Sequence, residues 1–107
     1  RFTPTAVMSE AEATPAATVL APAFPNPFNS SVRIPYVVAT AGDVDLVIYD
    51  MLGQRIRFLA RGNHDPGRYE VAWDGLDATG RTKASGTYLA RLKVGGDVHV
   101  TTLSLIR

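Results

Sequence analysis

The sequence predicts an all-β domain built as an antiparallel sandwich, and three observations support this fold class. Apolar and polar residues alternate with a period of two after residue 18, as in strands that bury one face. Turn-forming residues separate the alternating runs, and no helical spacing is sustained between them. About seven short strands at this spacing are typical of an Ig-like sandwich. The expected strands lie near residues 19–23, 31–38, 43–50, 54–61, 67–73, 86–94 and 97–106.

Each expected strand carries one apolar face and one polar face. In the last strand the apolar phase changes between Val100 and Leu103, so we expect a β-bulge at Thr101-Thr102 that re-aims the side chains. Pro35 indicates that the second strand is an edge strand or is bulged. The residues expected to face the core in the four clearest strands are Val44, Leu46 and Ile48; Ile56, Phe58 and Ala60; Tyr69, Val71 and Trp73; and Tyr88, Ala90, Leu92 and Val94.

Turn residues explain where the strands end. Gly95-Gly96 predicts a two-residue hairpin, and Gly53 can adopt the positive φ that a tight turn requires. Asp50 is expected to cap that turn with its own side chain, and Asp74 and Asp77 to bond backbone amides in a longer turn.

A proline-rich corner precedes the second strand. Pro25 and Pro27 remove two backbone donors and fix φ, so this stretch cannot be a central strand. We expect Phe28 to plug one end of the sandwich and Asn29 to bond a neighbouring backbone group.

Composition divides the chain in two. Residues 1–18 are rich in Ala, Thr, Pro and Glu, and such a segment cannot bury enough apolar surface to offset the entropy of ordering it. We expect an interdomain linker over 1–18 and the folded domain over 19–107. The chain begins at Arg1 and carries no leader sequence, so we expect it to be part of a longer protein whose export signal lies upstream.

Charge and composition exclude several function classes. Eleven basic residues against ten acidic ones give a net charge of +1, which is not the clustered basic surface of a nucleic-acid-binding protein. The absence of cysteine excludes disulfides and thiolate metal sites. No apolar run reaches the about 18 residues of a transmembrane helix. His64 and His99 have no regular spacing to a second ligand or a nucleophile, so the sequence predicts neither an enzyme nor a bound cofactor.

Three motifs in fixed order carry a family resemblance. The motifs are Pro25-Asn26-Pro27-Phe28-Asn29, Ile48-Tyr49-Asp50-Met51-Leu52-Gly53-Gln54 and Ser85-Gly86-Thr87-Tyr88-Leu89-Ala90-Arg91-Leu92. With the loop Trp73-Asp74-Gly75-Leu76-Asp77-Ala78-Thr79-Gly80 and the terminal run Leu103-Ser104-Leu105-Ile106-Arg107, they resemble the C-terminal sorting domains of proteins exported by the type IX secretion system. The Ig-like domain of the flagellar hook-capping protein shares much of this pattern.

The resemblance implies a non-catalytic C-terminal module that directs a larger secreted bacterial protein, often a hydrolase, to the cell surface. It implies recognition by the outer-membrane secretion and attachment machinery or attachment to a surface glycolipid, and we expect the domain to be a monomer. The positions that match the family pattern are Pro25, Asn26, Pro27, Phe28, Asn29, Tyr49, Asp50, Gly53, Trp73, Asp74, Gly75, Gly80, Ser85, Gly86 and Tyr88.

Outward-facing cations are the candidate partner-binding residues. The sequence places Arg55, Arg57 and Arg61 on one strand face, and Arg91 and Lys93 on another. Such charges protect strand edges against aggregation, and they would also suit docking on an anionic surface such as the outer membrane. With the terminal basic residue, the candidate set is Arg55, Arg57, Arg61, Arg91, Lys93 and Arg107.

Other functions stay open at this point. Trp73 with Tyr69 and Tyr88 could form a sugar-stacking platform, as in the carbohydrate-binding module of a secreted polysaccharide-degrading enzyme, although burial of these rings is the simpler expectation. Tyr49 is the aromatic residue expected to be most exposed. Asp74 and Asp77 are an alternative calcium site that lacks the ligand pattern of an EF-hand. A structural Ig-like spacer or subunit-interaction domain is the third alternative.

Overall fold

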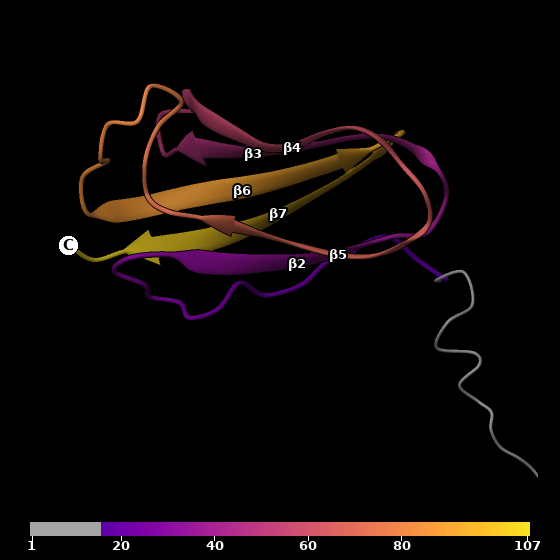
Figure 1. The fold of residues 1–107 in the computed structure, drawn as a ribbon, viewed down its shortest axis with the longest axis horizontal. Coiled ribbons are helices and arrows are strands. Elements are labelled where there is room, and N and C mark those ends of the chain that lie inside the picture. The colour runs from indigo at the N-terminus through magenta and orange to yellow at the C-terminus, as the bar shows by residue number, and fades with distance from the viewer. Residues whose placement is uncertain (1–15) are drawn as a thin grey trace, which may run out of the picture.

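The computed structural model describes residues 16–107 as an all-β sandwich (Figure 1), which confirms the predicted fold class. The predicted linker over residues 1–18 lies outside the described residues except for its last three. No helix occurs in the described part, so it contains none that is long and apolar enough to cross a membrane. The strands are β1 (Val19–Leu20), β2 (Val32–Val38), β3 (Gly42–Asp50), β4 (Arg55–His64), β5 (Gly67–Trp73), β6 (Gly86–Val94) and β7 (Asp97–Leu105).

The strands form two antiparallel sheets that bury their facing sides. One sheet has three strands in the order β1-β2-β5, and the other has four in the order β4-β3-β6-β7. Alternation in β2 and β6 matches this packing, because every second residue of each strand is buried. The first strand is shorter than the predicted 19–23, and beyond it Ala21 bonds Pro35 and Phe24 forms a bridge to Arg33.

Large aromatic side chains fill the two ends of the core. Trp73 is fully buried; its ring lies 5.7 Å from that of Phe28 and 5.2 Å from that of Tyr88. At the other end Tyr36 stacks on Tyr69 at 5.3 Å. Burial raises the pKa values of Tyr36 and Tyr88, and nearby Tyr69 adds to the effect on Tyr36. Each buried side chain of this size stabilises the fold by about 1.5–3 kcal/mol.

Pro35 does not mark an edge strand, contrary to the prediction. β2 is the middle strand of its sheet, and its register with β5 is continuous. Pro35 is tolerated because its backbone faces the β1 side, where its carbonyl accepts a hydrogen bond from Ala21 N–H at 3.0 Å. Ala21 lies opposite Pro35 in the same register, and the missing N–H of Pro35 leaves this pair with a single bond at the point where the pairing of β1 ends.

The bulge predicted at Thr101-Thr102 is absent, because β6 and β7 pair in a single register from end to end. The phase change has another cause. Leu103 and Leu105 face the core, whereas Val98 and Val100 lie on the outer side of the sheet and are 52% and 55% exposed. Val98 and Val100 are therefore not part of the core.

Two bulges occur instead in the pairing of β3 with β4. The register shifts between Leu46 and Val47 and again between Ile48 and Tyr49. These shifts leave Leu59 and Ile56 as extra residues in β4, and both pack against the core. Phe58 was predicted to face the core, but it pairs with Val47 and lies on the outer side.

Candidate partner-binding surface

The family motifs gather at one end of the sandwich, which we call the motif end. It comprises residues 21–31, the β3–β4 turn, the loop between β5 and β6, and the C-terminus (Figure 1). Residues 16–18, which lead into β1, lie at the opposite end (Figure 1). Residues distant in sequence therefore meet in one place.

The first motif binds the end of β7. Phe28 N–H donates to Ser104 O at 2.9 Å, and Ile106 N–H donates to Phe28 O at 2.8 Å. The Asn26 side chain completes the contact, because it donates to Thr102 O and accepts from Ser104 N–H, both at 2.9 Å. The expected side-chain bond to a neighbouring backbone is thus made by Asn26, whereas it was predicted for Asn29. Burial of Phe28 at this end agrees with its expected role as a plug.

The second motif is a side-chain-capped turn, as expected. One carboxylate oxygen of Asp50 accepts hydrogen bonds from the N–H groups of Leu52 and Gln54, each at 2.9 Å. Gly53 adopts a φ of 84°, which other residues reach only with strain. These features explain the conformation of the turn without a bound ion.

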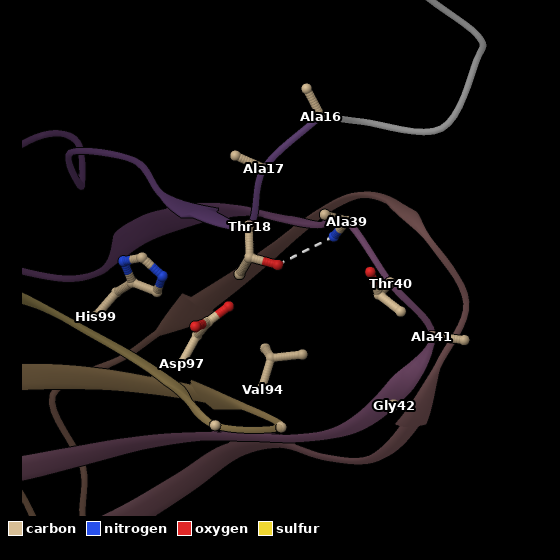
Figure 2. Close-up of a pocket in the computed structure, with 12 residues that line it drawn as sticks. Ala16, Ala17, Thr18, Ala39, Thr40, Ala41, Gly42, Val94, Asp97 and His99 are labelled. Atoms are coloured by element: carbon tan, nitrogen blue, oxygen red, sulfur yellow. Dashed lines mark hydrogen bonds between the residues drawn. The ribbon is translucent and has the colours of Figure 1, made fainter.

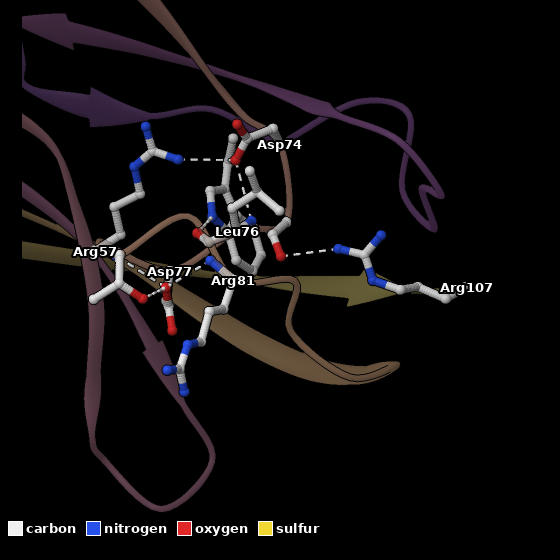
Figure 3. A network of polar contacts seen from close by, with 9 residues as sticks. Arg57, Asp74, Leu76, Asp77, Arg81 and Arg107 are labelled. Atoms are coloured by element: carbon white, nitrogen blue, oxygen red, sulfur yellow. Dashed lines mark hydrogen bonds and ion pairs between the residues drawn. The ribbon is translucent and has the colours of Figure 1, made fainter.

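The two carboxylates of the loop that follows Trp73 accept hydrogen bonds from groups within the domain (Figure 3). Asp74 accepts from Leu76 N–H at 3.1 Å and from the Arg57 guanidinium at 2.8 Å. Asp77 accepts from Thr79 and from Arg81 N–H. Within residues 16–107 no three His, Cys, Asp or Glu side chains gather in a way that could hold a metal ion. The expected turn bonds of both aspartates are therefore present.

Removing the charge of Asp77 should make the stability of the fold depend less on pH in the acidic range. Hydrogen bonds from the Thr79 hydroxyl and Arg81 N–H hold the pKa of Asp77 below its ordinary value of 3.8. A lowered pKa stabilises the folded state above the unfolded-state pKa, and this stability is lost as pH falls through the folded-state pKa. Asp77→Asn should thus lower the urea midpoint at about pH 7 and lower it less at about pH 2.5. Asp97→Asn, in an exposed hairpin, is the control, and an equal deficit at both pH values would contradict the assignment.

Arg107 clamps the motif end. Its guanidinium donates to Gly75 O at 2.9 Å and to Lys83 O at 2.7 Å, and its backbone N–H donates to Ser85 Oγ at 2.8 Å. Gly75 has a φ of 77°, and a Cβ atom there would lie 2.5 Å from Arg107 Nη2. The positive φ therefore favours glycine, and a side chain at this position would displace the Arg107 guanidinium. The guanidinium of Arg107, predicted as a partner-binding group, is engaged in holding the loop.

The remaining cations divide between two places. Arg57 was predicted to share a face with Arg55 and Arg61, but the bulges in β4 turn it towards Asp74 at the motif end. Arg55, Arg61, Arg91 and Lys93 do lie together, on the side of the four-stranded sheet that faces away from the core. We call this side the outer face; its members by register include Asp43, Asp45, Val47, Tyr49, Arg55, Phe58, Arg61, Asn63, Leu89, Arg91, Lys93, Val98, Val100 and Thr102.

Arginine side chains on the outer face stack on aromatic rings. The guanidinium carbons of Arg55 and Arg61 lie 4.8 and 4.1 Å from the centre of the Phe58 ring. Arg91 lies 5.1 Å from the centre of the Tyr49 ring. Such cation–π contacts hold the guanidinium planes in place and leave donors available. This position of Phe58 could not be predicted from the sequence. Phe58 and Leu59 are adjacent and both apolar, so either of them could have been the residue that faces the core.

The aromatic residues proposed for sugar stacking are not available for it. Trp73 and Tyr88 are buried, and Trp73 Nε1 and the Tyr88 hydroxyl donate to Leu76 O and Ala84 O at 2.8 and 2.6 Å. The half-buried Tyr69 donates to Asp65 O at 2.6 Å. A stacking platform needs an exposed ring face, so these residues do not support a carbohydrate-binding module.

A hollow of about 540 Å³ lies at the end opposite the motifs (Figure 2). Residues 16–18, the β2–β3 turn and the β6–β7 hairpin line it, and Thr18 Oγ1 accepts from Ala39 N–H at 3.1 Å. Most of the residues that line the hollow are small, and Asp97 and His99 are the titratable residues among them. Several convergent polar groups, as in a typical small-molecule site, are not gathered there.

Comparisons with known proteins identify related domains. The family model of the FlgD Ig-like domain matches residues 29–97. No curated protein sequence matches the chain.

Solved structures also resemble this chain. Dimeric latent PorU from Porphyromonas gingivalis has a TM-score of 0.63 and 21% identity, over 83% of this chain and 9% of PorU. PorZ from the same species, described as an essential surface component of its type IX secretion system, has a TM-score of 0.54 and 23% identity, over 96% of this chain and 13% of PorZ. FlgD from Xanthomonas campestris, linked to hook capping in flagellar assembly, has a TM-score of 0.52 and 26% identity, over 92% of this chain and 72% of FlgD. The likeness to PorU and PorZ shows a shared fold, and the chain spans only a small part of either protein.

Proposed function

The chain belongs to the FlgD Ig-like domain family, and from this premise we propose that it is a non-catalytic module for secretion and cell-surface attachment of a larger protein. Its partners would be the outer-membrane secretion and attachment machinery or a surface glycolipid, and its location would be outside the cell or on its surface. A hydrolase is the parent protein that the sorting-domain resemblance favours.

One contact between two of the motifs supports the proposal of a sorting module. The family match covers residues 29–97, so most of the first motif and all of the terminal run lie outside it. These two segments bond each other, because Asn26 and Phe28 pair with Thr102, Ser104 and Ile106. Two of the features that resemble sorting domains thus form one structural unit, although the FlgD structure from Xanthomonas campestris also covers 92% of this chain.

Type IX export of a fused reporter tests the proposal. The whole chain would be joined to the C-terminus of a reporter that carries its own signal for the periplasm, in a bacterium with a type IX system. We expect the reporter on the cell surface or in the medium, and in the periplasm when the chain is omitted or the secretion system is deleted. Equal retention inside the cell with and without the chain would overturn the proposal.

Point variants are better controls here than truncations. Deletion of residues 86–107 would remove β6 and β7, which are two of the four strands of one sheet, so loss of export could simply reflect unfolding. A folded surface variant separates recognition from stability.

A further inference from the structure

The two exposed sides of the sandwich differ in character. On the three-stranded sheet, Arg33 pairs with Glu70 at 3.4 Å, and Arg68 is also exposed. That side therefore has more cations than acidic residues, as the outer face also does. The outer face of the four-stranded sheet differs because its arginines stack on aromatic rings and lie among apolar side chains. This asymmetry indicates that the outer face has a role beyond solvation.

Apolar side chains form a connected group on the outer face. Val47 is 2% exposed although it is not part of the main core cluster, so the outer face buries an apolar residue of its own. Val98 and Val100 are more than half exposed on β7, which is separated from Val47 by β6. A hollow of about 260 Å³ is lined by Tyr49, Gly53, Leu89, Arg91 and Val100. Exposed apolar groups that gather in this way are typical of interaction sites.

The charges around this group favour an anionic partner. Four cations face two aspartates on the outer face, and one of these, Asp45, lies 3.8 Å from Arg61. Near the hollow, Arg55 and Arg91 have no acidic neighbour on the outer face. The Nε atom of Arg91 is buried and has no hydrogen-bond partner in the described residues. An incoming carboxylate cannot reach this buried atom, so it would engage the terminal Nη donors of the Arg91 guanidinium.

We propose that the outer face docks an acidic polypeptide segment. One apolar side chain of the segment fills the hollow between Tyr49 and Val100, and its carboxylates pair with Arg91 and Arg55. The hollow has room for one side chain, and the guanidinium groups present the planar donor pairs that match carboxylates. This inference rests on the proposed function only for the claim that the segment belongs to the secretion machinery.

Two double variants with the same change in charge provide the test. Arg91→Gln with Lys93→Gln alters the outer face, and Arg33→Gln with Arg68→Gln alters the opposite side. The probe is a short synthetic peptide in which Glu alternates with Leu and Phe, titrated into the isotope-labelled whole chain and followed by amide NMR shifts. We expect shifts at Val47, Leu89 and Val100, and about tenfold weaker binding for the outer-face variant. The opposite-side variant should change the affinity by less than about twofold.

Further arms identify the chemistry of the partner. The same peptide with Gln in place of Glu should bind about tenfold more weakly. Raising the NaCl concentration from about 0.05 to about 0.5 M should lower the affinity for the acidic peptide. Vesicles that contain phosphatidylglycerol distinguish a lipid surface from a peptide. If the outer-face variant loses its native NMR spectrum, Arg55→Gln with Val100→Ser replaces it, because both side chains are exposed.

Each outcome decides the inference. Equal loss of peptide binding in both double variants, no binding of the acidic peptide, or binding to the vesicles alone would overturn it. Failure of the fused reporter to leave the cell while the peptide still binds would overturn the proposed function instead.

Discussion

Replacing Trp73 with alanine is expected to lower the free energy of unfolding by about 3–5 kcal/mol. The ring is fully buried between Phe28 and Tyr88, and its Nε1–H bonds Leu76 O at 2.8 Å. Its removal creates a cavity at the motif end and leaves a carbonyl without its donor. Since small domains have only about 5–15 kcal/mol of stability in total, much of the chain should be unfolded at moderate urea concentration.

Urea unfolding followed by far-ultraviolet circular dichroism measures this loss, because Trp73 is the only tryptophan and its fluorescence disappears in the variant. Trp73→Phe keeps an aromatic ring but removes the Nε1–H donor, so it should cost less than Trp73→Ala. Arg68→Ala on the exposed side of β5 is the control, with an expected change within about 0.5 kcal/mol. A change of less than about 1 kcal/mol in Trp73→Ala would show that the ring is not a core residue.

Replacing Phe28 with alanine is expected to cost about 3–5 kcal/mol, towards the lower limit because the residue lies at the end of the core. The ring packs on Trp73 at 5.7 Å, while the backbone of Phe28 pairs with Ser104 and Ile106. The variant should therefore loosen the attachment of the terminal run as well as lower the global stability.

Hydrogen exchange separates these two effects. In Phe28→Ala the amides of Ser104 and Ile106 should exchange faster than the loss of global stability requires. The exposed neighbour Asn29 provides the matched control, since Asn29→Ala should change neither quantity appreciably. Unchanged protection of the Ser104 and Ile106 amides in Phe28→Ala would contradict the claim that the Phe28 ring helps to hold the terminal run against the first motif.

Most of the fold was readable from the sequence because the clear strands have one buried face. The alternation of Val44, Leu46 and Ile48 requires those residues to share a face, and all three are buried. The turn bonds of Asp50 and Asp77 were also predictable, because aspartate bonds backbone amides a few residues away. These features depend on short-range geometry alone.

The features that were missed depend on long-range geometry. The bonds of Asn26 to the end of β7 join residues 76 and 78 positions apart, and no local pattern indicates them. The bulges in β4 were hidden because Phe58 and Leu59 are both apolar. Val98 and Val100 suggested a bulge because an apolar residue was assumed to face the core, whereas they belong to the outer face.

The family motifs and the outer face are expected to have different roles, in stability and in recognition. Conformation and packing account for the family motifs at Asp50, Gly75 and Trp73. Charged and apolar groups without a structural purpose lie on the outer face. Recognition by a partner is therefore expected there, and substitutions in the motifs should act through stability.

Export of the fused reporter by the two charge-matched double variants is the most direct test of this account. Both variants should keep the NMR spectrum of a folded domain. We predict that Arg33→Gln with Arg68→Gln leaves the amount of surface-exposed reporter unchanged, and that Arg91→Gln with Lys93→Gln reduces it strongly. Equal export of the reporter by the two folded variants would contradict the claim that the outer face is the surface that the partner recognises.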